Sequence, residues 1–194
     1  MENMHVAQTF KLLNKEQYNI LDLLKPEEYR LVRRRMIESV LATDMALHAK
    51  TLSTLKSKAE TFDIKSGHNV ERMIFPDNLS KTYENQQTIL SMILHSADIS
   101  NPAKPHNIQR TWVDLVFIEF FKQGDLEKKN NLPVSLLCDR DTTNIDKSQV
   151  GFMSFVVIPS FETLLNFIPE IYQFMDCIKF NMKKYEDITK QENK

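Results

Sequence analysis

Apolar side chains recur every three or four residues along most of this chain, which is the spacing of one buried face of an α-helix. A helix start is clearest at Pro26, because Glu27 and Glu28 follow it in the first turn. Residues 62–81 lose this periodicity and contain glycine and proline, which favours a loop or a broken helix. Helices are expected at residues 6–13, 26–41, 47–55, 87–94, 108–123, 146–158 and 171–188.

The composition supports an all-α fold class. Glycine occurs only three times and proline seven times, whereas leucine, isoleucine, lysine and glutamate are abundant. With 194 residues, of which 42% are hydrophobic and 26% charged, the chain is long enough for one domain with its own core. We therefore expect a single domain over residues 1–194, with a frayed tail at residues 189–194. Asp146 is the expected N-cap of the helix that ends near Ile158.

Charge and cysteine content exclude several kinds of partner. The formal net charge is -1, so no basic field points to nucleic acid or to an anionic membrane. Cys138 and Cys177 form neither a disulfide framework nor a CxxC metal motif, which fits a reducing compartment. No apolar run approaches the ~20 residues that span a bilayer, and residues 1–3 do not begin a signal peptide. We expect a soluble, cytoplasmic protein without a membrane segment.

Two stretches carry candidate chemistry. In HSADISNP (residues 95–102), His95 and Asp98 lie three residues apart on one helix face, just before the proline ends the helix. A carboxylate buried there needs a cation or hydrogen-bond donors, although an isolated Asp of this kind is more often a cap or a surface pair. Residues 33–35 are all arginine and suggest an anion site. Three consecutive helical residues point in different directions, however, so a solvated face is the better interpretation.

Further motifs follow residues 95–102 in a fixed order. They are Trp112, EFF (119–121), QGD (123–125), CD (138–139) and KSQVGF (147–152). Upstream, residues 2–7 read ENMHVA and residues 41–45 read LATDM. From Glu2 to about Ile158, this ordered series resembles the catalytic domain of class I cyclic nucleotide phosphodiesterases, in which the corresponding upstream motifs are ENHHxA and LATDM.

The resemblance implies an all-α, multi-helix phosphodiesterase catalytic fold of the HD type. The helices that carry this family's HNxxH and His-Asp metal motifs have no counterpart in the sequence. We therefore expect the C-terminal portion of such a domain, incomplete at its N-terminal side. Without those helices, apolar surface would be exposed, and the chain would be marginally stable or prone to associate. A homodimer is one form that such association would take.

The resemblance also implies a centre of two divalent metals, a zinc and a magnesium or manganese. Asp98 occupies the position of one metal ligand. His5 and Thr43 match residues that orient metal-bound water, with Met4 replacing the first His of the family pair. By local chemistry, the hydroxyl of Thr43 can equally bond back to its own helix. The other ligands and the general-acid His lie outside this sequence, and His95 is better assigned to packing or hydrogen bonding, since it and Asp98 cannot complete a coordination shell.

The sequence contains more of the family's nucleotide-binding residues than of its metal ligands. By resemblance, Gln149 holds the purine and Phe152 stacks on it. The amide of Gln149 can donate and accept, so it can meet either adenine or guanine. Asn101 occupies a position at which members that prefer cAMP often carry Asn. The remaining pocket residues implied by the resemblance are Val116 and Ile99 opposite Phe152, with Met45 and Phe120 at the border.

The resemblance predicts hydrolysis of a 3′,5′-cyclic nucleotide, cAMP in preference to cGMP, to the 5′-monophosphate in signal transduction. The chain would supply the nucleotide pocket and one metal ligand, and we expect it to be inactive alone. An alternative is a truncated, non-catalytic helical domain that binds a nucleotide or a partner. A third is a helical interaction module whose resemblance is only ancestral.

Overall fold

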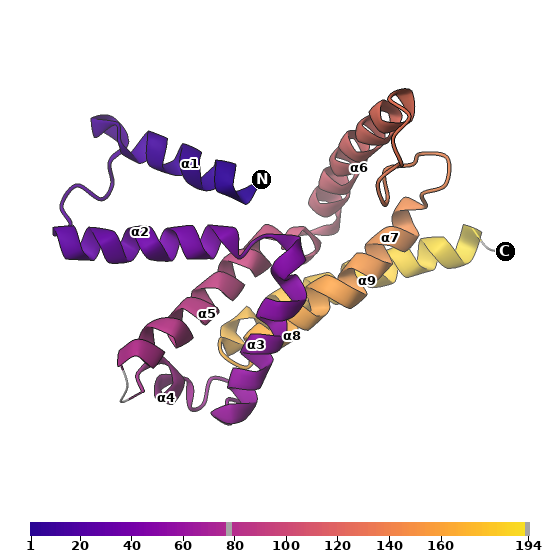
Figure 1. Cartoon of the computed structure of the whole chain (residues 1–194). Coiled ribbons are helices and arrows are strands. Elements are labelled where there is room, and N and C mark those ends of the chain that lie inside the picture. Colours follow the sequence, from indigo (N-terminus) through magenta and orange to yellow (C-terminus); the bar gives the residue numbers. More distant parts are fainter. Residues whose placement is uncertain (77–78, 193–194) are drawn as a thin grey trace. The chain divides into compact units, whose positions relative to one another are not determined.

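The computed structural model describes residues 1–76 and 79–192. This part of the chain is built from helices and short turns, with one isolated β-bridge between Lys65 and His68. The α-helices are α1 (Glu2–Leu13), α2 (Pro26–Leu41), α3 (His48–Thr61), α4 (Val70–Ile74), α5 (Leu79–Asp98), α6 (His106–Lys129), α7 (Ile145–Phe152), α8 (Ile158–Leu165) and α9 (Tyr172–Glu192) (Figure 1). The predicted all-α fold class is confirmed.

Backbone contacts divide the chain into two compact units. Unit 1 consists of Met1–Asp98 and Thr163–Pro169, and unit 2 consists of Ile99–Glu162 and Glu170–Lys194. The single domain over residues 1–194 stays a prediction. Each unit has buried apolar side chains of its own, such as Leu55 and Met92 in unit 1 and Val113 and Ile178 in unit 2.

In unit 1, polar side chains join helix α5 to its neighbours. Gln87 is buried and donates from Nε2 to the carbonyl oxygen of Arg35, at 3.3 Å, and to Oγ of Ser39, at 2.9 Å. Asn85 donates from Nδ2 to the carbonyl oxygen of Met73 on α4, at 2.8 Å. Residues 62–81, expected to be a loop or a broken helix, include the short helix α4 and the first turn of α5, so the broken helix is the better description.

In unit 2, α7 begins earlier than expected. Its N-cap is Asn144, whose Oδ1 accepts a hydrogen bond from the backbone N–H of Lys147 at 2.8 Å, so the assignment of this cap to Asp146 was wrong. The side chain of Asp146 instead pairs with Arg110, at 2.7 Å, and cannot cap the helix. At the other end of the unit, α9 continues to Glu192, so residues 189–192 are helical where we expected a frayed tail. Residues 193–194 lie outside the described part.

The helical run Ile145–Leu165 is long and apolar enough to cross a membrane by length and composition alone, where the sequence analysis expected no such run. The π-helical turn Met153–Val157 joins α7 to α8, so two short apolar segments form one continuous stretch despite Pro159. A core helix of a soluble protein passes the same test, and 33% of the stretch is buried. The run also contains the predicted base-binding residues Gln149 and Phe152.

Candidate functional site

The residues expected near the metals all belong to unit 1. Asp98 is the last residue of α5, and its side chain is exposed. His5 lies exposed on α1, and Thr43 and Met45 lie between α2 and α3. The hydroxyl of Thr43 donates to the carbonyl oxygen of Val40 at 2.8 Å, which is the bond to its own helix that local chemistry allowed. The roles of His5, Thr43 and Asp98 toward metals stay predictions.

A pair of histidines connects α3 to α5. The side chain of His95 is fully buried, and its Nε2 lies 2.9 Å from Nδ1 of His48, the first residue of α3. This contact confirms the assignment of His95 to packing or hydrogen bonding. Burial lowers the pKa of His48. Burial also lowers the pKa of His95, and His48 lowers it further, while Asp98 and the backbone of Thr43 oppose the shift.

The donor set does not fit a complete metal centre. Within residues 1–76 and 79–192, no group of three or more His, Cys, Asp and Glu side chains is arranged to hold a metal ion. Structural zinc is held by four donors, and catalytic zinc by three protein donors and a water. The described residues can therefore contribute single ligands such as Asp98, and they do not enclose a metal by themselves.

The residues predicted to contact the base lie in unit 2, apart from Met45, and side-chain amides of this unit form a chain of hydrogen bonds. Tyr185 of α9 donates from its hydroxyl to Oε1 of Gln109 on α6 at 2.8 Å, and both side chains are fully buried. Gln109 then donates from Nε2 to Oε1 of Gln149 on α7, at 3.5 Å. Burial raises the pKa of Tyr185, and the hydrogen bond to Gln109 opposes this shift. The phenol is therefore a neutral donor at physiological pH.

Asn101 belongs to the same network. Its Nδ2 donates to the carbonyl oxygen of Gln109 at 3.2 Å. Its Oδ1 is buried and accepts no hydrogen bond from the described residues. A buried acceptor without a donor costs free energy, so this oxygen is suited to a ligand that brings an N–H group.

Apolar side chains lie on the same elements as these amides. Val116 and Phe120 follow Gln109 at helical spacing on α6, and the Phe120 ring is held edge-on by Phe117, with 5.6 Å between ring centres. Phe152 lies one turn after Gln149 on α7 and is half-buried. Ile99 is buried next to Asp98 in the sequence. The meeting of Val116, Phe120 and Phe152 around one base stays a prediction.

An ion pair holds α7 against α6 close to Gln149. Arg110 donates from Nη1 to Oδ1 of Asp146 at 2.7 Å and from Nε to Oδ1 of Asp114 at 2.9 Å. Asp146 lies three residues before Gln149, so it shares the same face of α7. The bridge therefore fixes the helix turn that presents the Gln149 amide.

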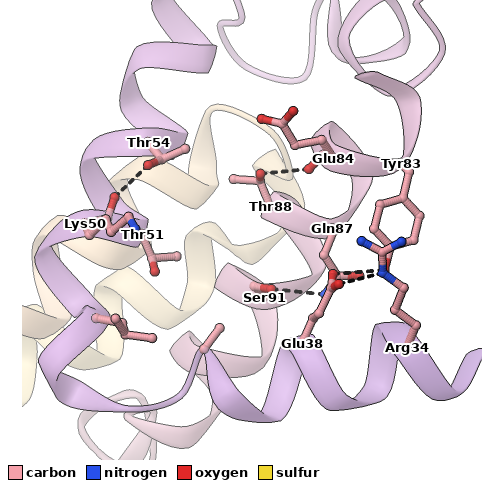
Figure 2. A pocket seen from close by; sticks show the side chains of 12 residues that line it. Arg34, Glu38, Lys50, Thr51, Thr54, Tyr83, Glu84, Gln87, Thr88 and Ser91 are labelled. Atoms are coloured by element: carbon pink, nitrogen blue, oxygen red, sulfur yellow. Dashed lines mark hydrogen bonds and ion pairs between the residues drawn. The ribbon is translucent and has the colours of Figure 1, made fainter. Parts of the chain in front are cut away.

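The structure also has a cavity that contains none of the predicted site residues. This hollow of about 640 Å³ lies among α2, α3 and α5 of unit 1, and Arg34, Glu38 and Tyr83 are on its wall (Figure 2). Hydroxyl and amide groups of α3 and α5 form much of the remaining wall. Because the predicted residues Asp98, Thr43 and Gln149 are not among its lining residues, we do not assign the candidate chemistry to this cavity.

His48, Gln109, Arg110 and Tyr185 were not among the residues predicted from the sequence. Gln109 lies one turn before Val113 on the buried face of α6, and a polar residue on such a face was a usable signal. Tyr185 lies 76 residues from Gln109, and no local pattern links the two. His48 follows the LATDM motif closely but pairs with a residue 47 positions away.

Comparison with known proteins supplies independent information. A family model described as 3′5′-cyclic nucleotide phosphodiesterase matches residues 1–178. A rat protein named 3′,5′-cyclic-AMP phosphodiesterase 4C is 36% identical over 187 residues, which cover 96% of this chain and 33% of the relative. A Drosophila melanogaster 3′,5′-cyclic-AMP phosphodiesterase, isoform F, is 34% identical over 189 residues, which cover 97% of this chain and 27% of the relative. The chain thus spans about a third of these relatives or less.

Two solved structures have folds similar to that of this chain. The phosphodiesterase domain of the RhoPDE fusion protein from the choanoflagellate Salpingoeca rosetta is 28% identical, with a TM-score of 0.82, over 99% of this chain and 57% of that one. The structure of LmjPDEB1 in complex with IBMX is 25% identical, with a TM-score of 0.83, over 98% of this chain and 53% of that one.

Proposed function

Since the chain belongs to the 3′5′-cyclic nucleotide phosphodiesterase family, we propose that it serves the hydrolysis of cAMP, in preference to cGMP, to the 5′-monophosphate. Its contribution is to bind and orient the purine. Asn101 and Gln149 are the residues that read the base, with Phe152, Val116 and Ile99 as its apolar contacts. Phe120 borders the same pocket, whereas the role of Met45, which belongs to unit 1, stays a prediction from the resemblance. The buried, unsatisfied Oδ1 of Asn101 is the observation that carries this proposal.

The polarity of the two amides favours adenine. Adenine presents an amino donor at the position where guanine presents the O6 acceptor. Oδ1 of Asn101 is an acceptor, and its Nδ2 is already bonded to the Gln109 carbonyl. The oxygen of Gln149 faces Nε2 of Gln109, which leaves the Gln149 amino group to donate to an acceptor of the base, such as adenine N1. For guanine, both amides would have to reverse.

On the metal side, Asp98 is the residue we assign as a ligand, and His5 and Thr43 as partners of metal-bound water. Zinc together with magnesium or manganese would supply the activated water and the charge neutralisation of a cyclic phosphodiester hydrolase. The described residues do not complete the coordination shells. The contribution that this chain can make by itself is therefore base recognition and one carboxylate.

Because no metal-binding cluster occurs among the described residues, one alternative deserves a test, a domain that binds the cyclic nucleotide without hydrolysing it. Two measurements on the purified chain separate the proposals. The first is formation of 5′-AMP from cAMP with zinc and magnesium present, beside Asp98→Ala. Turnover that this substitution abolishes supports the enzyme, and binding without turnover supports the alternative.

The second measurement is calorimetric titration with cAMP and with cGMP. We expect tighter binding of cAMP, and Asn101→Ala should reduce this preference because it removes the acceptor for the amino group. The matched control is Asn107→Ala, an exposed asparagine in the first turn of α6. Equal affinity for both nucleotides, or an equal effect of both substitutions, would contradict the assignment of Asn101.

A further inference from the structure

Three arginines of α2 border a hollow that the catalytic and base-binding proposals do not use. The hollow measures about 300 Å³, and its lining residues are Arg30, Arg33, Arg34, Ile37 and Glu38. These positions follow helical spacing, so they form one face of the helix. From the sequence, residues 33–35 suggested an anion site, and a solvated face was the better interpretation. The structure replaces that set with Arg30, Arg33 and Arg34, which do share a surface.

Arg35 is used elsewhere. Its guanidinium donates to Oε1 of Gln86 at 2.6 Å and of Gln87 at 3.4 Å, and it lies 4.5 Å from the centre of the Tyr83 ring. This side chain therefore holds α2 against α5. Because it is turned away toward α5, the arginines that remain for a ligand lie on a single face of α2.

Two of the remaining arginines are held in place by aromatic rings. Cζ of Arg33 lies 4.8 Å from the centre of the Phe10 ring of α1. Cζ of Arg34 lies 4.4 Å from the Tyr83 ring, and its Nε donates to Oε1 of Glu38 at 2.8 Å (Figure 2). Such contacts reduce the side-chain entropy that an arginine loses when it binds a ligand.

The charges around the hollow favour a dianion. Three arginines and one glutamate, Glu38, line the hollow, which leaves an excess of two positive charges among the lining residues although the whole chain has a net charge of -1. Glu38 is already engaged, since it accepts from Arg34 and from the hydroxyl of Tyr83 at 2.9 Å. Arg30 is exposed and makes no ion pair with the described residues. A phosphomonoester carries about -1.5 to -2 charges at neutral pH, which matches this excess.

We propose that this hollow binds a phosphorylated segment of a polypeptide, with Arg30 and Arg33 donating to the phosphate and Ile37 contacting an adjacent apolar side chain. Planar guanidinium groups bind phosphate through paired hydrogen bonds, which is how phosphopeptide-binding proteins use arginine clusters. A lipid surface fits less well, because the exposed Glu27 and Glu28 precede Arg30 on α2 and would repel an anionic membrane. This site goes beyond the nucleotide chemistry and does not depend on it.

The test uses the whole chain and a fluorescein-labelled peptide that contains phosphoserine beside leucine, followed by fluorescence anisotropy. The unphosphorylated peptide, inorganic phosphate as a competitor, and vesicles of phosphatidylcholine with phosphatidylserine are run in parallel. The variants are Arg30→Gln, Arg33→Gln and Arg33→Lys. Arg72→Gln is the matched control, since it removes one exposed arginine of α4 with the same change in net charge.

We expect Arg30→Gln and Arg33→Gln each to weaken phosphopeptide binding about fivefold to tenfold, as the loss of one charge-assisted bond predicts. Arg33→Lys should be intermediate, because lysine keeps the charge and loses the planar fork. Arg72→Gln should leave the affinity unchanged. Arg30 makes no ion pair and no side-chain hydrogen bond with the described residues, so its variant tests the site even if Arg33→Gln disturbs α1.

Several outcomes would overturn the proposal. Equal affinity for the phosphorylated and unphosphorylated peptides would exclude a phosphate site. Inorganic phosphate that binds as tightly as the peptide would reduce the hollow to a simple ion site. Binding of vesicles without binding of peptide would assign the surface to a membrane, and an equal effect of Arg72→Gln would leave only general electrostatic attraction.

Discussion

The hydrogen bond between Tyr185 and Gln109 permits a quantitative test of the polar interior of unit 2. The substitution Tyr185→Phe removes the hydroxyl and leaves Oε1 of Gln109 without its donor at 2.8 Å. Both side chains are fully buried, so water cannot replace the lost bond without opening the core. The free energy of unfolding should fall by roughly 1–3 kcal/mol, the cost of leaving one buried acceptor unsatisfied.

A double-mutant cycle separates this cost from a simple change in packing. Gln109→Leu removes the acceptor that Tyr185→Phe leaves unsatisfied, so the two substitutions together should destabilise less than the sum of their separate effects, by about 1 kcal/mol. Urea unfolding followed by far-ultraviolet circular dichroism measures all four proteins. Tyr172→Phe, at an exposed tyrosine of the same helix, is the control and should change stability by less than about 0.5 kcal/mol.

Two results would refute this reasoning. The first is a Tyr185→Phe protein as stable as the Tyr172→Phe control, which would mean that the hydroxyl bond contributes nothing to folding. The second is strict additivity in the cycle, which would mean that the two groups do not interact.

In the nucleotide titration, Tyr185→Phe should also narrow the preference for cAMP over cGMP, because Gln109 then no longer has a fixed amide orientation to impose on Gln149.

Three further predictions concern other parts of the chain. Gly124→Ala should destabilise unit 2 by about 3 kcal/mol or prevent folding, because the new Cβ would lie 2.0 Å from the carbonyl oxygen of Cys138; a thermal midpoint equal to wild type would contradict this. Because the pKa values of His48 and His95 are lowered in the folded chain, the free energy of unfolding should be highest above pH 6.5, the pKa of an unfolded histidine, and should decrease as the pH falls below that value. In His48→Gln, the thermal midpoint should change less with pH across this range. Asp146→Asn should weaken cAMP binding in calorimetry, since it loosens the ion pair that holds α7 to α6, and an unchanged affinity would show that the pair is dispensable.

Local pattern predicted the fold class and most helices but not all of their ends. The apolar spacing of residues 108–123 marks the centre of α6, which extends from His106 to Lys129. Helix α5 was expected to begin near Gln87 and begins at Leu79, because its first turns are polar and are held by contacts with α2 and α4. Such tertiary contacts leave no periodic signal in the sequence.

The same limit applies to the candidate site. The motif KSQVGF made Gln149 a candidate, because a motif keeps its residues close together in the sequence. It could not identify Gln109 or Tyr185, which are 40 and 76 positions away from their respective partners. Nor could the motif show that Oδ1 of Asn101 accepts no hydrogen bond from the described residues, since that depends on the packing of three helices.

The polar contacts of α9 also limit how this helix can be aligned. Asn181 donates to the carbonyl oxygens of Pro102 and Lys104, both at 2.8 Å, while Tyr185, one turn later, donates to Gln109. A slip of α9 by one turn would place Lys184 or Ile188 near these acceptors and leave several buried groups unpaired. An apolar interface would tolerate such a slip with little loss. The polar contacts of Asn181 and Tyr185 therefore select a single register for the last helix. When both residues are replaced by hydrophobic residues of similar size, unit 2 should still fold, but α9 should adopt several competing alignments.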